Sequence, residues 1–76
     1  MSDRETEVDA RGLLCPLPVL RAQKVLAGLP RGALVRLHAT DAASWVDVPH
    51  FCTHAGHELV SATEAGGTKT YLIRRG

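Results

Sequence analysis

The chain has 76 residues and a mass of 8.2 kDa, which leaves room for one domain with one small core. Hydrophobic residues make up 45% of it and charged residues 22%, and no apolar run approaches the roughly 20 residues of a membrane helix. The 9 Lys and Arg against 8 Asp and Glu give a net charge of +1, so we expect no direct binding to nucleic acid or to a membrane surface.

The amino-terminal segment and the cysteine content both predict a cytoplasmic protein. Residues 1–9 are polar and acidic, without the basic start and apolar stretch of a secretory signal. Two cysteines, Cys15 and Cys52, are too few for a disulfide scaffold, and a reducing compartment keeps thiols unpaired. We therefore expect a chemical role for at least one thiol, in a protein that is a monomer when free.

The first elements predicted along the chain are a strand and a helix. A short strand around residues 5–9 leads to Gly12, which can adopt a turn conformation that other residues resist. A helix is expected to start at Pro16, because proline suits the first helical position, and to end at Ala27 or Gly28. Its apolar stripe toward the core consists of Val19, Ala22, Leu26 and Leu29.

A second strand and a second helix follow. Residues 33–39 alternate between apolar and polar side chains, the pattern of a half-buried strand. Asp47 is a candidate cap for the next helix, which Gly56 should end. Pro49 within that segment indicates a break in the helix or a late start.

The chain closes with two strands, over residues 58–63 and 69–74, joined as a hairpin by the turn at residues 65–67. The order β-α-β-α-β-β, with right-handed crossovers, predicts an α/β two-layer sandwich in which both helices cover one face of a four-stranded mixed sheet. We expect residues 1–76 to form this single domain. The uncovered sheet face, with Arg36 and His38, would be a docking surface or simply solvated.

The strongest local signal is the segment from Gly12 to Pro18, which places Cys15 at a junction between a loop and a helix. Cys15 is the predicted N-cap, where free N–H groups and the helix dipole stabilise an anionic sulfur and make a thiol more acidic. At an exposed site the dipole lowers a pKa by less than about one unit, so Arg11 is a candidate for further help. The competing interpretation is that Cys15 is a buried, inert cysteine, which the two flanking prolines disfavour.

Residues 9–20, Lys24, and residues 39–41, 47–52 and 56–59 resemble the TusA/SirA-like sulfur-carrier family. The Cys-Pro-x-Pro motif at residues 15–18 is the most specific part, although Leu17 stands where many relatives carry a charged residue. The resemblance implies a β-α-β-α-β-β sandwich and a sulfurtransferase that carries sulfur as a persulfide on Cys15, without a bound cofactor.

The resemblance also implies protein partners. The sulfur donor would be a cysteine desulfurase or a rhodanese-like protein, and an acceptor protein would pass the sulfur to tRNA thiolation, molybdenum-cofactor synthesis or sulfur oxidation. A basic helix face next to Cys15 could meet an acidic partner surface. The residues expected to support Cys15 or partner docking are Arg11, Gly12, Pro16, Pro18, Arg21 and Lys24.

Other residues allow alternatives. Trp45 and Val46 form a possible contact patch, unless the tryptophan closes the core. Cys52 is either a core cysteine or a resolving partner for Cys15. A helix stripe could hold a transition metal with Cys52 or be a solvated face, and its residues are Asp47, His50, His54 and His57.

Two other functions compete with sulfur transfer. A non-catalytic regulatory or interaction module would keep its function without Cys15. A thiol-disulfide redox protein would form a reversible bond between Cys15 and Cys52.

Overall fold

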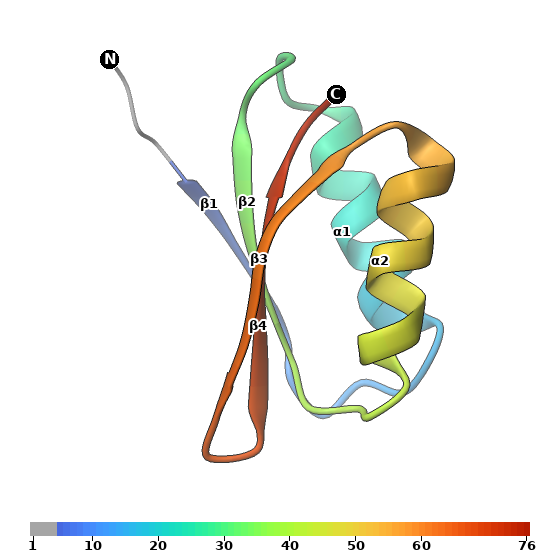
Figure 1. Ribbon diagram of the computed structural model, residues 1–76, viewed down its shortest axis with the longest axis vertical. Coiled ribbons are helices and arrows are strands. Elements are labelled where there is room, and N and C mark those ends of the chain that lie inside the picture. Colours follow the sequence, from blue (N-terminus) through green and yellow to red (C-terminus); the bar gives the residue numbers. More distant parts are fainter. Residues whose placement is uncertain (1–4) are drawn as a thin grey trace.

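The computed structural model describes residues 5–76, and its elements follow the predicted order (Figure 1). The first four residues of the polar amino-terminal segment lie outside the described residues. The strands are β1 (Glu5–Ala10), β2 (Leu34–Ala39), β3 (Glu58–Ala65) and β4 (Thr68–Arg74), and the helices are α1 (Leu17–Ala27) and α2 (Ser44–Ala55).

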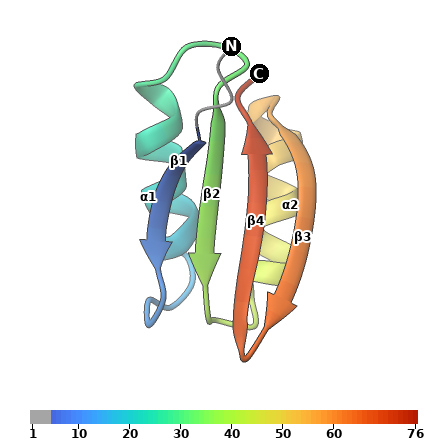
Figure 2. The same cartoon turned by 90° about the vertical axis from the view of Figure 1, so that its left-hand side faces the viewer.

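The four strands form one mixed sheet in the order β1-β2-β4-β3. β1 and β2 are parallel, whereas β4 is antiparallel to both of its neighbours. Both helices cover the same face of the sheet (Figures 1 and 2), which confirms the predicted two-layer sandwich. Because β1 and β2 are parallel, the loops that follow them leave the sheet at the same end. Neither α1 nor α2 is long and apolar enough to cross a membrane.

The core lies between the sheet and the helices, as the alternation and the helical stripe predict. In α1, Ala22 and Leu26 are fully buried, and Val19 and Leu29 pack against the core at its margin. The sheet contributes the alternate residues of its two central strands, because successive side chains of a strand point to opposite faces. Those fully buried strand residues are Val35, Leu37, Ala39, Tyr71 and Ile73.

The second helix begins earlier than predicted, at Ser44, and continues through Pro49 without a break. Asp41 provides the start, because its carbonyl accepts hydrogen bonds from the Ser44 amide at 3.1 Å and from the Ser44 hydroxyl at 2.7 Å. Pro49 removes one intrahelical hydrogen bond, but the buried side chains of Val48 and Cys52 hold the helix on the sheet. Asp47 therefore lies in the first turn of α2 and is not its cap.

Glycine conformations end α2 and shape the hairpin as predicted. Gly56 has φ +80 at the C-cap of α2, the left-handed conformation that a side chain resists. Gly66 and Gly67 have φ +59 and +84 between β3 and β4. Two consecutive positive φ values match the tight turns that join antiparallel strands.

The open sheet face carries cross-strand pairs of charged side chains. Arg36 pairs with Glu5 at 2.7 Å, and the His38 Nε2 atom lies 2.7 Å from a Glu7 carboxylate oxygen. Both basic residues thus lie on this face, as predicted. Because solvent screens such pairs, they add little to stability.

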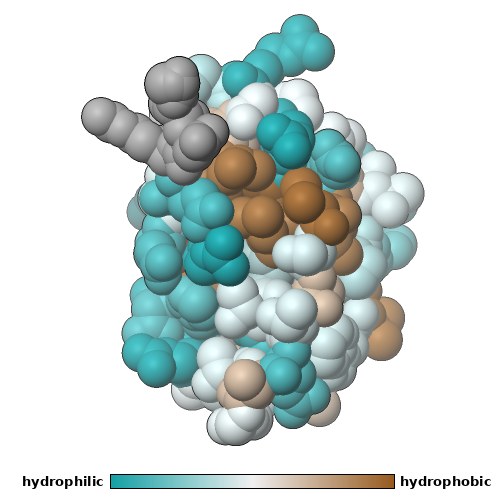
Figure 3. All heavy atoms as spheres, turned by 60° about the vertical axis from the view of Figure 1, so that its left-hand side comes forward, coloured by the Kyte–Doolittle hydropathy of each residue, from teal (hydrophilic) through white to brown (hydrophobic). Residues whose placement is uncertain are grey.

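Apolar side chains also gather on the open face, where Figure 3 shows a hydrophobic patch bordered by hydrophilic residues. The register places half-buried Leu34 and Leu72 on this face, because the residues next to them along each strand face the core. Val60, which is 39% exposed, lies at the irregularity between Leu59 and Ser61 in β3. The open face is therefore not uniformly polar.

Candidate functional site around Cys15

Cys15 lies in the loop between β1 and α1, just before the first helical turn. The helix begins at Leu17 with Pro16 at the N-cap position, so the prediction that Cys15 is the N-cap is wrong by one residue. The difference arises because the Leu17 amide donates to the Leu14 carbonyl at 2.8 Å and closes a turn there. That amide is therefore not available to the Cys15 sulfur.

The Cys15 loop is fastened to the loop that follows β2. The Gly12 amide donates to the Thr40 hydroxyl oxygen at 2.9 Å, and the Cys15 amide donates to Asp41 Oδ2 at 2.6 Å. Gly12 has φ +81, which confirms the turn conformation expected of it. These contacts form because the parallel strands β1 and β2 deliver both loops to the same end of the sheet.

The Cys15 thiol is hydrogen-bonded to a carboxylate. Its Sγ donates to Oδ2 of Asp47, which projects from the first turn of α2. The hydrogen bond to Asp47, partial desolvation, and the negative charges of Asp47 and Asp41 raise the pKa of the Cys15 thiol above its usual value. The prediction of a more acidic thiol is therefore wrong, because carboxylates and not free N–H groups surround the sulfur.

Arg11 does not provide the positive charge that was expected near Cys15. Its guanidinium binds both carboxylate oxygens of Asp9, with Nε 2.9 Å from Oδ1 and the second nitrogen 3.0 Å from Oδ2. These hydrogen bonds hold the pKa of the Asp9 carboxyl well below its usual range. The side chain of Arg11 stabilises the turn after β1 instead.

A largely apolar groove of about 320 Å³ opens beside Cys15, between the start of α1 and α2. Cys15 itself is exposed and lies at this groove. The other lining residues are Pro16, Val19, Asp47, His50, Phe51 and His54. A second sulfur atom attached to Cys15 thus has open space next to it.

Comparison with known proteins identifies the family. A family model described as "Sulfurtransferase TusA" matches residues 6–75. The chain belongs to this family. It is 42% identical to the sulfur carrier protein TusA of Pseudomonas syringae over 93% of this chain and 84% of the relative. It is 41% identical to that of Allochromatium vinosum over 99% of each chain.

A solved structure confirms the architecture of this TusA family member. The crystal structure of the SirA-like protein from Desulfitobacterium hafniense superimposes with a TM-score of 0.83 at 27% sequence identity. The match covers 93% of this chain and 97% of that one. The fold and the sulfur-carrier function that the sequence resemblance implied are both confirmed.

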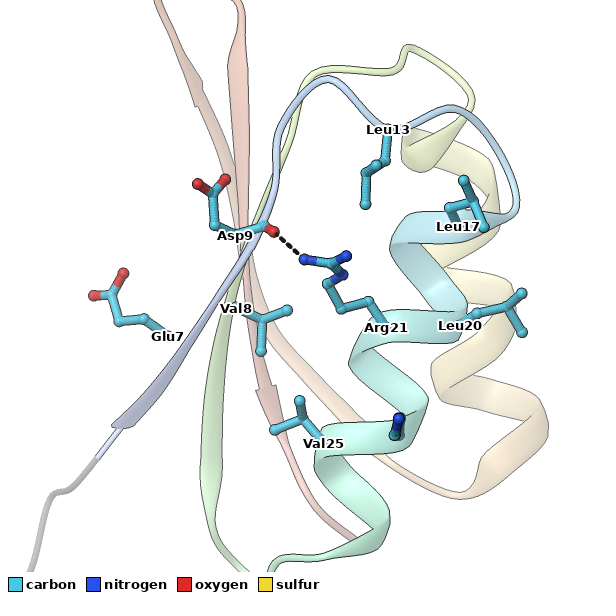
Figure 4. Close-up of a pocket in the computed structure, with 9 residues that line it drawn as sticks. Glu7, Val8, Asp9, Leu13, Leu17, Leu20, Arg21 and Val25 are labelled. Atoms are coloured by element: carbon cyan, nitrogen blue, oxygen red, sulfur yellow. Dashed lines mark hydrogen bonds between the residues drawn. The ribbon is translucent and has the colours of Figure 1, made fainter.

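Arg21 and Lys24 line a second groove, of about 590 Å³, between α1 and β1 (Figure 4). Arg21 reaches from α1 toward β1, where its Nη1 donates to the Asp9 carbonyl at 3.3 Å. The groove does not include Cys15. The two basic residues are exposed as predicted, but Arg21 also fastens the helix to the strand.

Three large apolar residues before and after Cys15 in the sequence are exposed, and the two on α1 also line the groove between α1 and β1. Leu14 is 70% exposed, Leu17 48% and Leu20 51%. Pro18 is buried at the second position of α1, where it rests on the core and stiffens the helix entrance. Leu14 and Leu20 were not predicted as contact residues, although both are large apolar residues that lie outside the apolar stripe of the predicted helix.

Trp45 and Val46 remain partly or largely exposed at the start of α2. Trp45 is 39% exposed and packs edge-on against buried Tyr71, with ring centroids 5.8 Å apart. Val46 is 71% exposed. Trp45 therefore covers the margin of the core while presenting part of its surface to solvent.

Cys52 is a core cysteine, as one of the two interpretations predicted. It is 2% exposed within the core cluster, and both thiols are free. Burial raises the pKa of Cys52 to about 11, so its thiol is protonated at neutral pH.

This difference in burial predicts selective labelling. In the folded protein, iodoacetamide should modify Cys15 and leave Cys52 unreacted, because Cys52 is neither ionised nor accessible. In denaturant both thiols should react. Intact mass and peptide mapping measure the outcome, and equal labelling of both thiols in the folded protein would contradict the buried placement of Cys52.

The histidines of the predicted metal stripe do not converge on one site. His50 and His54 stack with ring centroids 4.6 Å apart, whereas the His57 Nδ1 accepts the Gly76 amide at 3.0 Å. Over residues 5–76, no three His, Cys, Asp or Glu side chains are grouped as metal ligands.

Asp41 and Asp47 are the site residues that the sequence analysis missed. Asp47 was predicted as a helix cap or a metal ligand, and Asp41 only as part of the family resemblance, so neither was assigned to Cys15. The available signal was the β-α-β pattern, because residues that follow two adjacent parallel strands meet at one end of the sheet.

Proposed function

We propose that this sulfur carrier holds sulfane sulfur as a persulfide on Cys15, stoichiometrically and without a bound cofactor. The observation that carries the proposal is the exposure of the Cys15 thiol beside an open groove, while the other thiol is sealed in the core. The names of the relatives support sulfur carriage, and the Cys-Pro-x-Pro motif supports Cys15 as its position.

Loading is a thiol exchange. The Cys15 sulfur attacks the terminal sulfur of a donor persulfide, R–S–SH, forming a new S–S bond as the donor S–S bond breaks. The donor leaves as R–SH, and Cys15–SH becomes Cys15–S–SH. Delivery repeats the exchange with an acceptor thiol, so sulfur moves without net oxidation or reduction.

Both partners are proposed to be proteins, a cysteine desulfurase or rhodanese-like donor and a thiol-bearing relay protein as acceptor. They would dock over the exposed leucines on either side of Cys15 in the sequence, Leu14 and Leu17, with Leu20 about one turn further along α1. Such exposed apolar residues beside a reactive group are typical of protein contact sites. Arg21 and Lys24, further along α1, would add attraction to an acidic partner surface.

The direct test is incubation with a cysteine desulfurase, its cysteine substrate and no reductant, followed by intact-mass measurement. The protein should gain the mass of one sulfur atom, and thiol reduction should remove it. A protein that gains no sulfur from desulfurase, rhodanese or small-molecule persulfides would refute the proposal.

Leu17→Asp should weaken transfer from a protein donor by roughly 10-fold, because it places a charge in the proposed contact. Loading from glutathione persulfide, which needs no protein contact, should be unchanged. Asp suits the first turn of a helix, so the fold should tolerate it. Val60→Asp, an exposed apolar site on β3, is the matched control, and equal effects of the two variants would argue against docking at Leu17.

A further inference from the structure

The geometry points to Asp47 as a catalytic residue that accepts the Cys15 proton while the sulfur attacks a donor persulfide. This inference rests on the proposed persulfide function of Cys15. Its basis is the hydrogen bond from the Cys15 sulfur to Asp47 Oδ2, in which the thiol proton already points at a carboxylate.

A proton acceptor is needed because the resting thiol is not ionised. The thiolate is the nucleophile in sulfur exchange, yet the surroundings of Cys15 raise its pKa and keep the proton on sulfur at neutral pH. An uncharged thiol attacks poorly unless its proton leaves during the reaction. The acidic environment that hinders ionisation therefore also contains the group that can take the proton.

The other titratable side chains near the sulfur make different contacts. Asp41 uses Oδ2 for the Cys15 amide at 2.6 Å and Oδ1 for the Ala43 amide at 3.3 Å, so it positions the loop. His50 and His54 line the same groove but stack on each other. Among the described residues, the hydrogen bond of the sulfur goes to Asp47.

The step balances without an external reagent. As the Cys15 sulfur bonds to the terminal sulfur of R–S–SH, the thiol proton passes to Asp47 and the donor S–S bond breaks, releasing R–S⁻. The proton then passes from Asp47 to R–S⁻, which leaves as R–SH. Asp47 is a carboxylate again, and Cys15 carries the persulfide.

The test compares the wild-type protein with Asp47→Asn in two measurements. The first is the ionisation midpoint of Cys15, followed by thiolate absorbance, which should fall because a negative charge next to the sulfur is lost. The second is the rate of loading from glutathione persulfide at neutral pH, followed by intact mass, which should fall by about 100-fold. Removing a residue that only suppressed ionisation would speed up loading, so a lower ionisation midpoint together with slower loading identifies Asp47 as the proton acceptor.

Controls separate this inference from the carrier function. Asp47→Glu keeps a carboxylate and should recover part of the loading rate. Asp47→Ser also removes the carboxylate and should show the same loss as Asp47→Asn, which rules out a disturbance of α2 by the asparagine amide as the cause. Glu58→Gln removes the same charge beyond the other end of α2 and should leave loading unchanged. Loading by Asp47→Asn at or above the wild-type rate would overturn the role of Asp47, whereas a wild-type protein that never loads would overturn the carrier function itself.

Discussion

Cys15→Ser should abolish sulfur loading, because a serine hydroxyl cannot form the S–S bond that holds the cargo. The change is nearly isosteric at an exposed loop position, so the fold should be unaffected. Serine can still hydrogen-bond to Asp47, which preserves the contact between the loop and α2. Intact mass after incubation with a persulfide donor measures the loss directly.

The matched control is Cys52→Ala, which removes the other thiol without placing a hydroxyl in the core. It should load one sulfur at the wild-type rate, with a modest loss of thermal stability from the smaller side chain. Loading that disappears in Cys52→Ala and persists in Cys15→Ser would move the carrier role to the buried thiol. Loss of loading in both variants would instead indicate a Cys15 to Cys52 disulfide cycle.

Leu26→Ala should cause a large loss of stability. Leu26 is fully buried on the inner side of α1, and removing such a side chain costs about 2–5 kcal/mol in the free energy of unfolding. Small domains have about 5–15 kcal/mol in total, so the variant should be close to unfolding. The expected fall in melting temperature is at least roughly 8 °C for a chain of this size.

Leu20→Ala, on the same helix, is the control for this prediction. Leu20 is 51% exposed, so its truncation should change the free energy of unfolding by no more than about 0.5 kcal/mol. Circular dichroism during thermal and urea denaturation measures both variants. Equal losses in the free energy of unfolding for Leu20→Ala and Leu26→Ala would mean that α1 packs on the sheet with a different side than described.

The wrong prediction for the Cys15 thiol has a clear physical origin. A helix dipole at an exposed site changes a pKa by less than about one unit, and the helix here begins two residues after Cys15. Two carboxylates at hydrogen-bond distance from the residue outweigh it.

Most of the fold follows from local patterns. Alternation marked β2, the apolar stripe marked the inner side of α1, and consecutive glycines marked the hairpin. The start of α2 could not be predicted in the same way, because the Asp41 carbonyl and Ser44 hydroxyl form it by contacts that no periodicity reveals. The break predicted at Pro49 does not occur for a related reason, because core packing of α2 outweighs the loss of one helical hydrogen bond.

The exposed position of Cys15 could be predicted from the chain alone, since Cys-Pro-x-Pro at a helix entrance is a short-range motif whose stiffness depends on neighbouring residues. The protonation state of the Cys15 thiol could not be predicted from the sequence. Asp41 and Asp47 lie 26 and 32 positions away along the chain and come close to Cys15 only through the parallel pairing of β1 with β2. Charge acts over distances in space, so a side chain's acidity belongs to the folded arrangement around it.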